Sequence, residues 1–240
     1  MIVYVNGDSY AVTSHGKRYS EFLGEHYKCK VINAAISGSS NTRILRTTLR
    51  DLIQLRSQNH VVIAFISLSF LMRTELWDPN IIHNKFLNDG EFTSIQPTHS
   101  KSWFYDKMDL VDSKYKDFCK QFLLNYNVEA ETTKLIQNIL LLSSWCKQNQ
   151  VKCIIFSSAL QEPIDYTAPF IKDFYKEMVN DKNIINIFEF SFTEWCLSHK
   201  FVPISAYTQN IHGQDYDIGH HDEEAHRAFA NFLIEYSNEI

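Results

Sequence analysis

The chain has 240 residues, of which 45% are hydrophobic and 21% charged, and its formal net charge is −5. These proportions are ordinary for a globular domain and exclude disordered, collagen-like and coiled-coil classes. The acidic balance and the lack of a long basic run argue against a protein that binds nucleic acid through its phosphates.

The N-terminus and the cysteines both indicate the compartment in which the protein is made. The chain starts without the basic residues and apolar core of a signal peptide, and no apolar run approaches the roughly 18 residues that cross a bilayer. Its five cysteines are odd in number and have no CxxC spacing, which favours free thiols in a reducing compartment. We therefore expect cytoplasmic synthesis and no membrane partner, with release inside a phage virion left open.

Predicted strands and helices alternate along the chain. Continuous apolar runs, typical of strands covered on both faces, predict three strands and two weaker ones: Ile2–Val5, His60–Ile66, Lys152–Phe156, and then Cys29–Ile32 and Ile184–Phe188. Apolar residues at helical spacing predict five helices: Tyr19–Tyr27, Thr42–Arg56, Ala130–Lys147, Ala168–Val179 and Glu223–Tyr236. This alternation predicts a single α/β domain over residues 1–240, with helices on both faces of a parallel sheet.

One long segment, from about residue 73 to residue 112, breaks this alternation and is rich in aromatic residues. A loop of this length is uncommon unless it is functional. It begins where the third strand should end, at the sheet edge where ligands of parallel sheets bind. We expect an insertion over the rim of the site, whose Trp77, Trp103 and Tyr105 suit the stacking of a sugar ring. A packing flap without substrate contact is the alternative.

A Gly-Asp-Ser turn follows the first predicted strand, at Gly7, Asp8 and Ser9. A glycine at this point lets the backbone bend sharply and presents the next side chains at the sheet edge. There Ser9 could act as a nucleophile while its N–H holds a developing oxyanion. An ordinary polar turn is the alternative interpretation.

A second stretch of small residues leads into the predicted helix that starts at Thr42. Within it, Gly38 could donate its backbone N–H toward a developing negative charge. The plainer interpretation is a helix start, with Ser40 or Asn41 as the N-cap residue. The two interpretations are compatible.

Near the C-terminus, Asp217 and His220 are three residues apart on a segment that we expect to be irregular. A single turn would let the carboxylate orient the imidazole and stabilise its charged form. The spacing favours His220 as the general base, and His15, His221 and His226 are its rivals.

The same stretch holds three histidines and several carboxylates, a composition that also suits a metal site. No further ligand cluster is evident elsewhere in the sequence, so we expect neither a metal nor another cofactor. Asp222 is expected to be the N-cap residue of the last helix.

In this order, the three segments resemble the SGNH/GDSL hydrolase superfamily. Gly7-Asp8-Ser9 matches the first block, whose serine is the nucleophile; Gly38 matches the second, whose glycine donates to the oxyanion hole; and Asp217 with His220 matches the fifth. The resemblance implies a flavodoxin-like three-layer α/β/α sandwich with a five-stranded parallel sheet. It also implies a catalytic triad of Ser9, Asp217 and His220, and an oxyanion hole formed by the N–H groups of Ser9 and Gly38.

One departure concerns the third block of this superfamily, Gly-x-Asn-Asp, whose asparagine is another oxyanion donor. The corresponding stretch here contains Ser67 and Ser69 but no asparagine. Either serine could substitute with a shorter side chain, and Asn41 or Arg73 could help. Without a substitute, losing one oxyanion donor costs about 10²–10³ in rate. Weaker candidates for substrate binding are therefore Asn41, Ser67, Arg73 and, from the insertion, Trp103.

The expected function is that of a serine esterase that hydrolyses short-chain esters. Because many SGNH relatives remove O-acetyl groups from carbohydrates, the resemblance implies a small-molecule or glycan ester as the substrate. Two alternatives remain: a non-catalytic SGNH-fold protein that binds glycans or has a structural part in a virion, and an enzyme that transfers the acyl group to a sugar. The sequence leaves the oligomeric state open.

Overall fold

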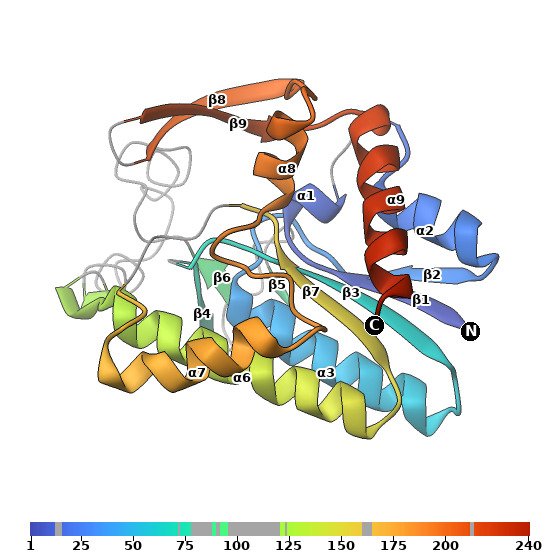
Figure 1. The fold of residues 1–240 in the computed structure, drawn as a ribbon, viewed down its shortest axis with the longest axis horizontal. Coiled ribbons are helices and arrows are strands. Elements are labelled where there is room, and N and C mark those ends of the chain that lie inside the picture. The colour runs from blue at the N-terminus through green and yellow to red at the C-terminus, as the bar shows by residue number, and fades with distance from the viewer. Residues whose placement is uncertain are drawn as a thin grey trace.

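The computed structural model describes residues 1–12, 16–71, 73–77, 88–89, 92–95, 121–122, 124–159, 165–211 and 214–240 (Figure 1). Within these ranges, residues 76, 77, 88, 89, 92–95, 205–211 and 214–219 are described by their backbone.

Four parallel strands form the central sheet, in the order β2–β1–β3–β7. Their bounds are Ile2–Asn6 for β1, Lys30–Asn33 for β2, Val62–Leu68 for β3 and Lys152–Ser157 for β7. Every residue of β1 and β3 is buried, which explains their continuous apolar sequences. The order is that of a flavodoxin-like sheet, so the predicted α/β fold class is confirmed.

The expected fifth strand, Ile184–Phe188, is reduced to two isolated parallel bridges, Ile155 with Ile184 and Ser157 with Ser191. Between these bridges the outer segment passes residues 185–190 while β7 passes only residue 156, so this segment bulges away from the sheet. One cause is local: the Asn186 side chain accepts a hydrogen bond from the Phe188 N–H, an Asx-type turn that competes with strand pairing. The predicted five-stranded sheet is corrected to four strands and these two bridges.

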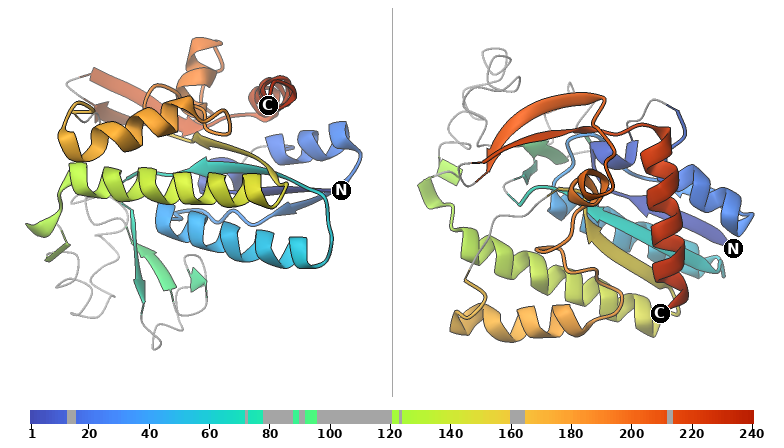
Figure 2. Two further views of the ribbon diagram at one scale, coloured as in Figure 1. Left: turned by 60° about the horizontal axis from the view of Figure 1, so that its bottom comes forward. Right: turned by 45° about the horizontal axis from the view of Figure 1, so that its top comes forward.

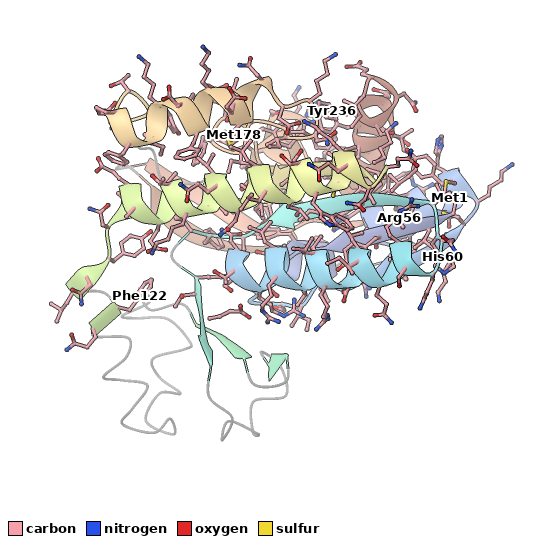
Figure 3. The ribbon with its side chains drawn as sticks, turned by 90° about the horizontal axis from the view of Figure 1, so that it is seen from below. Met1, Arg56, His60, Phe122, Met178 and Tyr236 are labelled. Carbon is pink, nitrogen blue, oxygen red and sulfur yellow. The ribbon has the colours of Figure 1, made fainter. Side chains whose placement is uncertain are left out.

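Helices cover both faces of the sheet, which gives the expected three layers (Figure 2). One face packs against α3 (Asn41–Ser57), α6 (Val128–Gln148) and α7 (Pro169–Asn180). Figure 3 shows these three helices side by side, with Arg56 close to the end of α3 and Met178 on α7. The other face packs against α2 (Tyr19–Tyr27), α8 (Phe192–Ser198) and α9 (Glu223–Asn238).

Two smaller sheets lie outside these layers. The predicted insertion contains β4 (Thr74–Trp77), β5 (Asn88–Asp89) and β6 (Phe92–Ile95), which form an antiparallel sheet in the order β4–β6–β5. Trp103 and Tyr105 of the insertion lie outside the described residues. Before α9, β8 (Ser205–Ile211) and β9 (Gln214–His220) form an antiparallel hairpin.

This hairpin corrects the expectation of an irregular segment around Asp217 and His220. In β9, Asp217 pairs with Thr208 and His220 pairs with Ser205. A strand rises ~3.4 Å per residue, so three residues separate the two Cα atoms by about 10 Å. No single turn connects the two residues.

Of the described cysteines, Cys29, Cys146, Cys153 and Cys196 are all free, whereas Cys119 lies outside the described residues. No helix in the described part of the chain is long and apolar enough to span a membrane.

Candidate active site

The candidate residues gather at one edge of the sheet. The strand order reverses between β1 and β3, and ligands of open parallel sheets bind beyond the carboxyl ends of the strands at this reversal. Ser9 follows β1 directly, and Ser69 follows β3.

Ser9 is the first residue of a short helix, α1 (Ser9–Val12), and is partly exposed. Asp8 caps this helix: its Oδ1 accepts the Tyr10 N–H at 3.2 Å, and its carbonyl accepts the Ala11 N–H at 3.1 Å. The Ser9 N–H stands at the start of the helix, where backbone N–H groups have no partner within the helix.

Gly7 lets this turn lie against the neighbouring strand. A Cβ at Gly7 would be 2.9 Å from the Ser67 Cβ of β3 and 3.2 Å from the Ala11 Cβ, which is closer than carbon atoms pack. The glycine of the Gly-Asp-Ser motif is therefore needed for a close approach between β1 and β3 rather than for an unusual backbone angle.

Gly38 lies in a tight turn that is tied to Ser9's turn. The turn is closed by a hydrogen bond from the Ser39 N–H to the Ile36 carbonyl at 3.1 Å, and Gly38 has φ +82°. A positive φ at the third residue of a β-turn strongly favours glycine. The Ile36 N–H donates to the Gly7 carbonyl at 3.2 Å, which joins the two turns. Ser40 caps α3 as expected, accepting the Arg43 N–H.

A buried ion pair lies beneath both turns. The Asp8 side chain is 0% exposed, and its Oδ2 accepts hydrogen bonds from the Ser69 Oγ at 2.8 Å and from the Arg73 Nη1 at 3.0 Å. The Arg73 side chain is 11% exposed, and its Nη1 also contacts the Ser69 hydroxyl and, at 3.5 Å, the Ser39 carbonyl. These contacts all lie within the protein.

The other two described candidates for substrate binding are buried as well. The Asn41 amide accepts the Ser69 N–H at 2.7 Å and donates to the Ser69 carbonyl at 3.0 Å, so it pins the end of β3 to the start of α3. Ser67 is buried in β3, and among the described residues its hydroxyl has no hydrogen-bond partner. The structure thus buries Asn41 and Ser67 and leaves the Arg73 side chain 11% exposed, and Trp103 lies outside the described residues.

His220, the last residue of β9, lies beside the Gly-Asp-Ser turn. Its ring centroid is 5.1 Å from that of Tyr10, the residue after Ser9. The backbone of Asp217 lies in the same strand, and its role as the acid of the triad stays a prediction. His15 lies outside the described residues.

The two remaining rival bases, His221 and His226, are 0% exposed. Among the described residues, neither ring nitrogen of either side chain has a hydrogen-bond partner. The His226 ring stacks on Phe192 and Tyr19 with centroid distances of 5.2 and 5.8 Å, and the His221 ring meets the edge of Phe192 at 5.5 Å.

This burial has an electrostatic consequence. It lowers the pKa of His221 to about 4 and the pKa of His226 to about 3, because a charged imidazole loses its hydration there. Both rings are therefore neutral at pH 7. A general base must reach the proton that it removes, so this geometry favours the partly exposed His220 over its two neighbours.

The sequence interpretation missed the Asp8–Arg73 ion pair, which with Ser69 and the Ser39 carbonyl forms an ionic floor beneath the site. Asp8 is part of the recognised motif, but its pairing with Arg73 joins residues 65 positions apart. The available signal was indirect: polar residues follow β1 and β3, and these strands end at the same edge. Across the described ranges, no group of three or more His, Cys, Asp or Glu side chains is placed to hold a metal ion.

No family model matches the chain, and no curated protein does. Solved structures do match over nearly its full length. A lipolytic protein of the G-D-S-L family from Desulfitobacterium hafniense DCB-2 is 14% identical, with 98% of each chain covered and a TM-score of 0.43. The psychrotrophic esterase EstA from Pseudoalteromonas sp. is 14% identical, with 99% of this chain and 97% of the other covered and a TM-score of 0.46. A GDSL-like lipase from Parabacteroides merdae ATCC 43184 is 13% identical, with coverages of 99% and 95% and a TM-score of 0.41.

Proposed function

We propose that this chain is a serine hydrolase of the SGNH/GDSL type that hydrolyses short-chain esters. The observation that carries the proposal is the meeting of three distant segments at the reversal point of the sheet. Ser9 starts α1 partly exposed, the Gly38 turn is joined to that turn through Ile36 and Gly7, and the His220 ring lies beside Tyr10. This proximity supports the proposal of Ser9 as nucleophile, Gly38 as oxyanion donor and His220 as general base.

In the proposed mechanism, the Ser9 Oγ attacks the ester carbonyl while His220 accepts its proton. The N–H groups of Ser9 and Gly38 hold the tetrahedral oxyanion, and His220 then protonates the leaving alkoxide. Water activated by His220 hydrolyses the acyl-enzyme and regenerates Ser9. On the resemblance to the fifth block alone, Asp217 is proposed to orient His220 and to stabilise its charged form. In β9 the two residues lie on opposite faces of the strand, so this role requires β9 to bend between them.

The proposed substrate is an acetylated carbohydrate. This part of the proposal rests on the resemblance of the motifs and on the aromatic sequence of the insertion. The missing third-block asparagine supports the alternative of a non-catalytic protein of the same fold that binds glycans, with or without a structural part in a virion. Transfer of the acyl group to a sugar instead of water is a variant of the same chemistry, and product analysis with a competing acceptor distinguishes it.

The test is turnover of p-nitrophenyl acetate together with labelling by a fluorophosphonate probe. We expect the native chain to turn the ester over and to carry the label on Ser9, and Ser9→Ala to lose both. Ser37→Ala is the matched control, because Ser37 is an exposed serine next to Gly38, and it should keep both activities. Full turnover by Ser9→Ala would refute the assignment, and glycan binding without labelling would favour the non-catalytic alternative.

A second comparison tests the base. His220→Ala should lower kcat by several orders of magnitude, whereas His226→Ala should keep most of the rate per folded molecule. Asp217→Asn should lower kcat while leaving KM nearly unchanged. The reverse pattern for the two histidines would move the base to His226.

A further inference from the structure

The guanidinium of Arg73 touches all three chain segments that form the floor of the site. Through Nη1 it donates to the Asp8 carboxylate at 3.0 Å, contacts the Ser69 hydroxyl, and lies 3.5 Å from the Ser39 carbonyl. Asp8 belongs to the turn after β1, Ser39 to the turn before α3, and Ser69 to the end of β3.

We propose that Arg73 is the positioning residue of the oxyanion hole. This inference rests on the proposed function. Asp8 directly precedes Ser9, and Ser39 directly follows Gly38, so Arg73 holds the neighbours of both N–H donors. By holding them together it fixes the Ser9 and Gly38 N–H groups relative to each other.

The Asp8 carboxylate transmits this constraint. Its Oδ2 is held by Arg73 and Ser69, while its Oδ1 accepts the Tyr10 N–H and so caps the first turn of α1. Any rotation of the carboxylate would break contacts on both sides. The orientation of the first α1 peptides, including the N–H of Ser9, is therefore linked to the position of the Arg73 guanidinium.

An arginine suits this position better than a lysine does. A guanidinium is planar and presents several N–H donors in fixed directions, whereas an ammonium is a compact point charge. The Arg73 guanidinium also lies over the Phe70 ring, with its Cζ 4.8 Å from the centroid, which fixes its plane. Preorganised donors stabilise a transition state because they need no reorientation during the reaction.

Ser69 explains why such a residue is needed here. It follows β3 directly, where its hydroxyl donates to the Asp8 carboxylate and its backbone is held by Asn41. The serine thus serves the floor of the site. The hole then depends on two backbone donors, and the geometry of these two donors depends on the floor.

The chain offers a matched control pair, Arg46 and Glu75. Arg46 donates to both oxygens of the Glu75 carboxylate, at 2.8 and 3.3 Å, and the Glu75 side chain is only 4% exposed. Like Arg73, this pair fastens the start of the insertion to the body of the domain. None of its described contacts involves Asp8, Ser39 or Ser69.

The experiment compares Arg73→Gln with Arg46→Gln. Each variant is titrated with a fluorophosphonate probe, so that kcat is expressed per reactive Ser9, and the inhibition constant of a boronic acid that mimics the tetrahedral intermediate is measured. Arg73→Gln should lower kcat per titrated site by about 10²-fold, since a misplacement of about 1 Å has an effect of that size. KM should change by less than about 3-fold, and boronate affinity should fall in parallel with kcat/KM. Arg46→Gln should keep both kinetic constants.

The double variant Asp8→Asn/Arg73→Gln separates positioning from stability. It removes the unpaired buried charge that Arg73→Gln leaves, so the midpoint of urea unfolding should recover while kcat per titrated site stays low. Native kcat per titrated site in Arg73→Gln, or an equal fall in Arg46→Gln, would overturn the positioning role. A native chain that neither turns over ester nor labels at Ser9 would instead remove the proposed function, and the positioning role with it.

Discussion

The two sides of the candidate site are held by different forces. On the side of Ser9, the proposed nucleophile, Asp8 and Asn41 are buried and the Arg73 side chain is 11% exposed. Hydrogen bonds of 2.7 to 3.0 Å connect Asn41 to Asp8 through Ser69 and Asp8 to Arg73. On the side of the base, His221 and His226 are equally buried, yet in the described structure their ring nitrogens have no hydrogen-bond partners and their rings pack against aromatic side chains.

Because of this difference, the two sides of the site should be sensitive to different changes. Hydrogen bonds are directional, so the floor under Ser9 fixes both the position and the orientation of the groups above it. Aromatic packing is less directional, but each buried imidazole is kept neutral by its surroundings. We therefore expect the nucleophile side to fail when a partner is removed, and the histidine side to fail when the pH falls.

The largest expected effect is the removal of the Asp8 carboxylate. Asp8→Ala leaves Arg73 buried without this partner, and breaking a buried ion pair in this way costs about 3–5 kcal/mol in the free energy of unfolding. It also removes the cap of α1, so kcat per titrated Ser9 should fall as well. Urea unfolding and active-site titration measure the two effects.

A second buried carboxylate serves as the control for this change. Asp181 accepts hydrogen bonds from Ser143 at 2.6 Å and pairs with Lys147 at 2.7 Å, between α6 and the end of α7. Asp181→Ala should also lower stability, but kcat per titrated site should stay native. If both variants lost kcat equally, the ionic floor would have no special role in the site.

The next effect tests the histidine side through pH. An unfolded histidine titrates near 6.5, whereas burial lowers the pKa of His221 to about 4 and that of His226 to about 3. Between these values the unfolded chain binds protons that the folded chain does not. Each ring therefore contributes stability that is fully present above pH 6.5 and is lost as the pH falls, by up to about 1.4 kcal/mol per pH unit.

The measurement is urea unfolding between pH 7.5 and pH 4.5, with replacement of one ring. His226→Phe keeps a flat ring between Tyr19 and Phe192 and removes two nitrogen atoms that have no hydrogen-bond partner among the described residues. It should therefore be as stable as the native chain at pH 7.5 and lose less stability in acid. His199→Gln, which replaces an exposed histidine, is the control for the loss of one imidazole from the chain. An unchanged acid slope in His226→Phe would mean that this ring is not the source.

The sequence predicts the nucleophile side well because its signals are local. Strands β1 and β3 are buried on both faces, so their apolar runs are visible, and the Gly-Asp-Ser turn and the Ser40 cap follow from single positions. The pairing of Asp8 with Arg73 is different. It depends on the order of the strands and on which residues leave their ends, and neither is encoded within a short window.

The histidine side is harder to predict from the sequence. The β8–β9 hairpin contains Asp, Asn and Gly residues that strands disfavour, so its pairing comes from tertiary context rather than from propensity. The burial of His226 is easier to predict from the sequence, because this residue lies one turn before Phe229 on the apolar face of α9. The predicted strand Ile184–Phe188 shows a similar limit of sequence-based prediction. Its apolar residues favour a strand, but the Asx turn at Asn186 interrupts the pairing.

A smaller effect is expected at Gly38, whose φ of +82° disfavours any side chain. Gly38→Ala should cost about 1–2 kcal/mol in the free energy of unfolding, or else the turn should change its conformation. A changed turn displaces an N–H of the proposed hole, so kcat should then fall with KM nearly unchanged. Ser37→Ala, one residue earlier in the same turn, should leave both properties native, and a Gly38→Ala variant whose turn has moved but whose kcat is native would place the oxyanion donor elsewhere.

The smallest expected effect is at Asp222, which connects the histidine side to α9. Its Oδ1 accepts the Ala225 N–H at 2.9 Å, so it caps the helix as the sequence predicts. Asp222→Ala should cost about 1 kcal/mol, whereas Asp222→Asn keeps a good cap and should cost less than half of that. Because the Asp222 charge raises the pKa of His221, both variants should lower that pKa further, which NMR titration of the imidazole measures. Equal destabilisation by the two variants would show that the charge matters more than the cap, and that packing alone does not hold this side of the site.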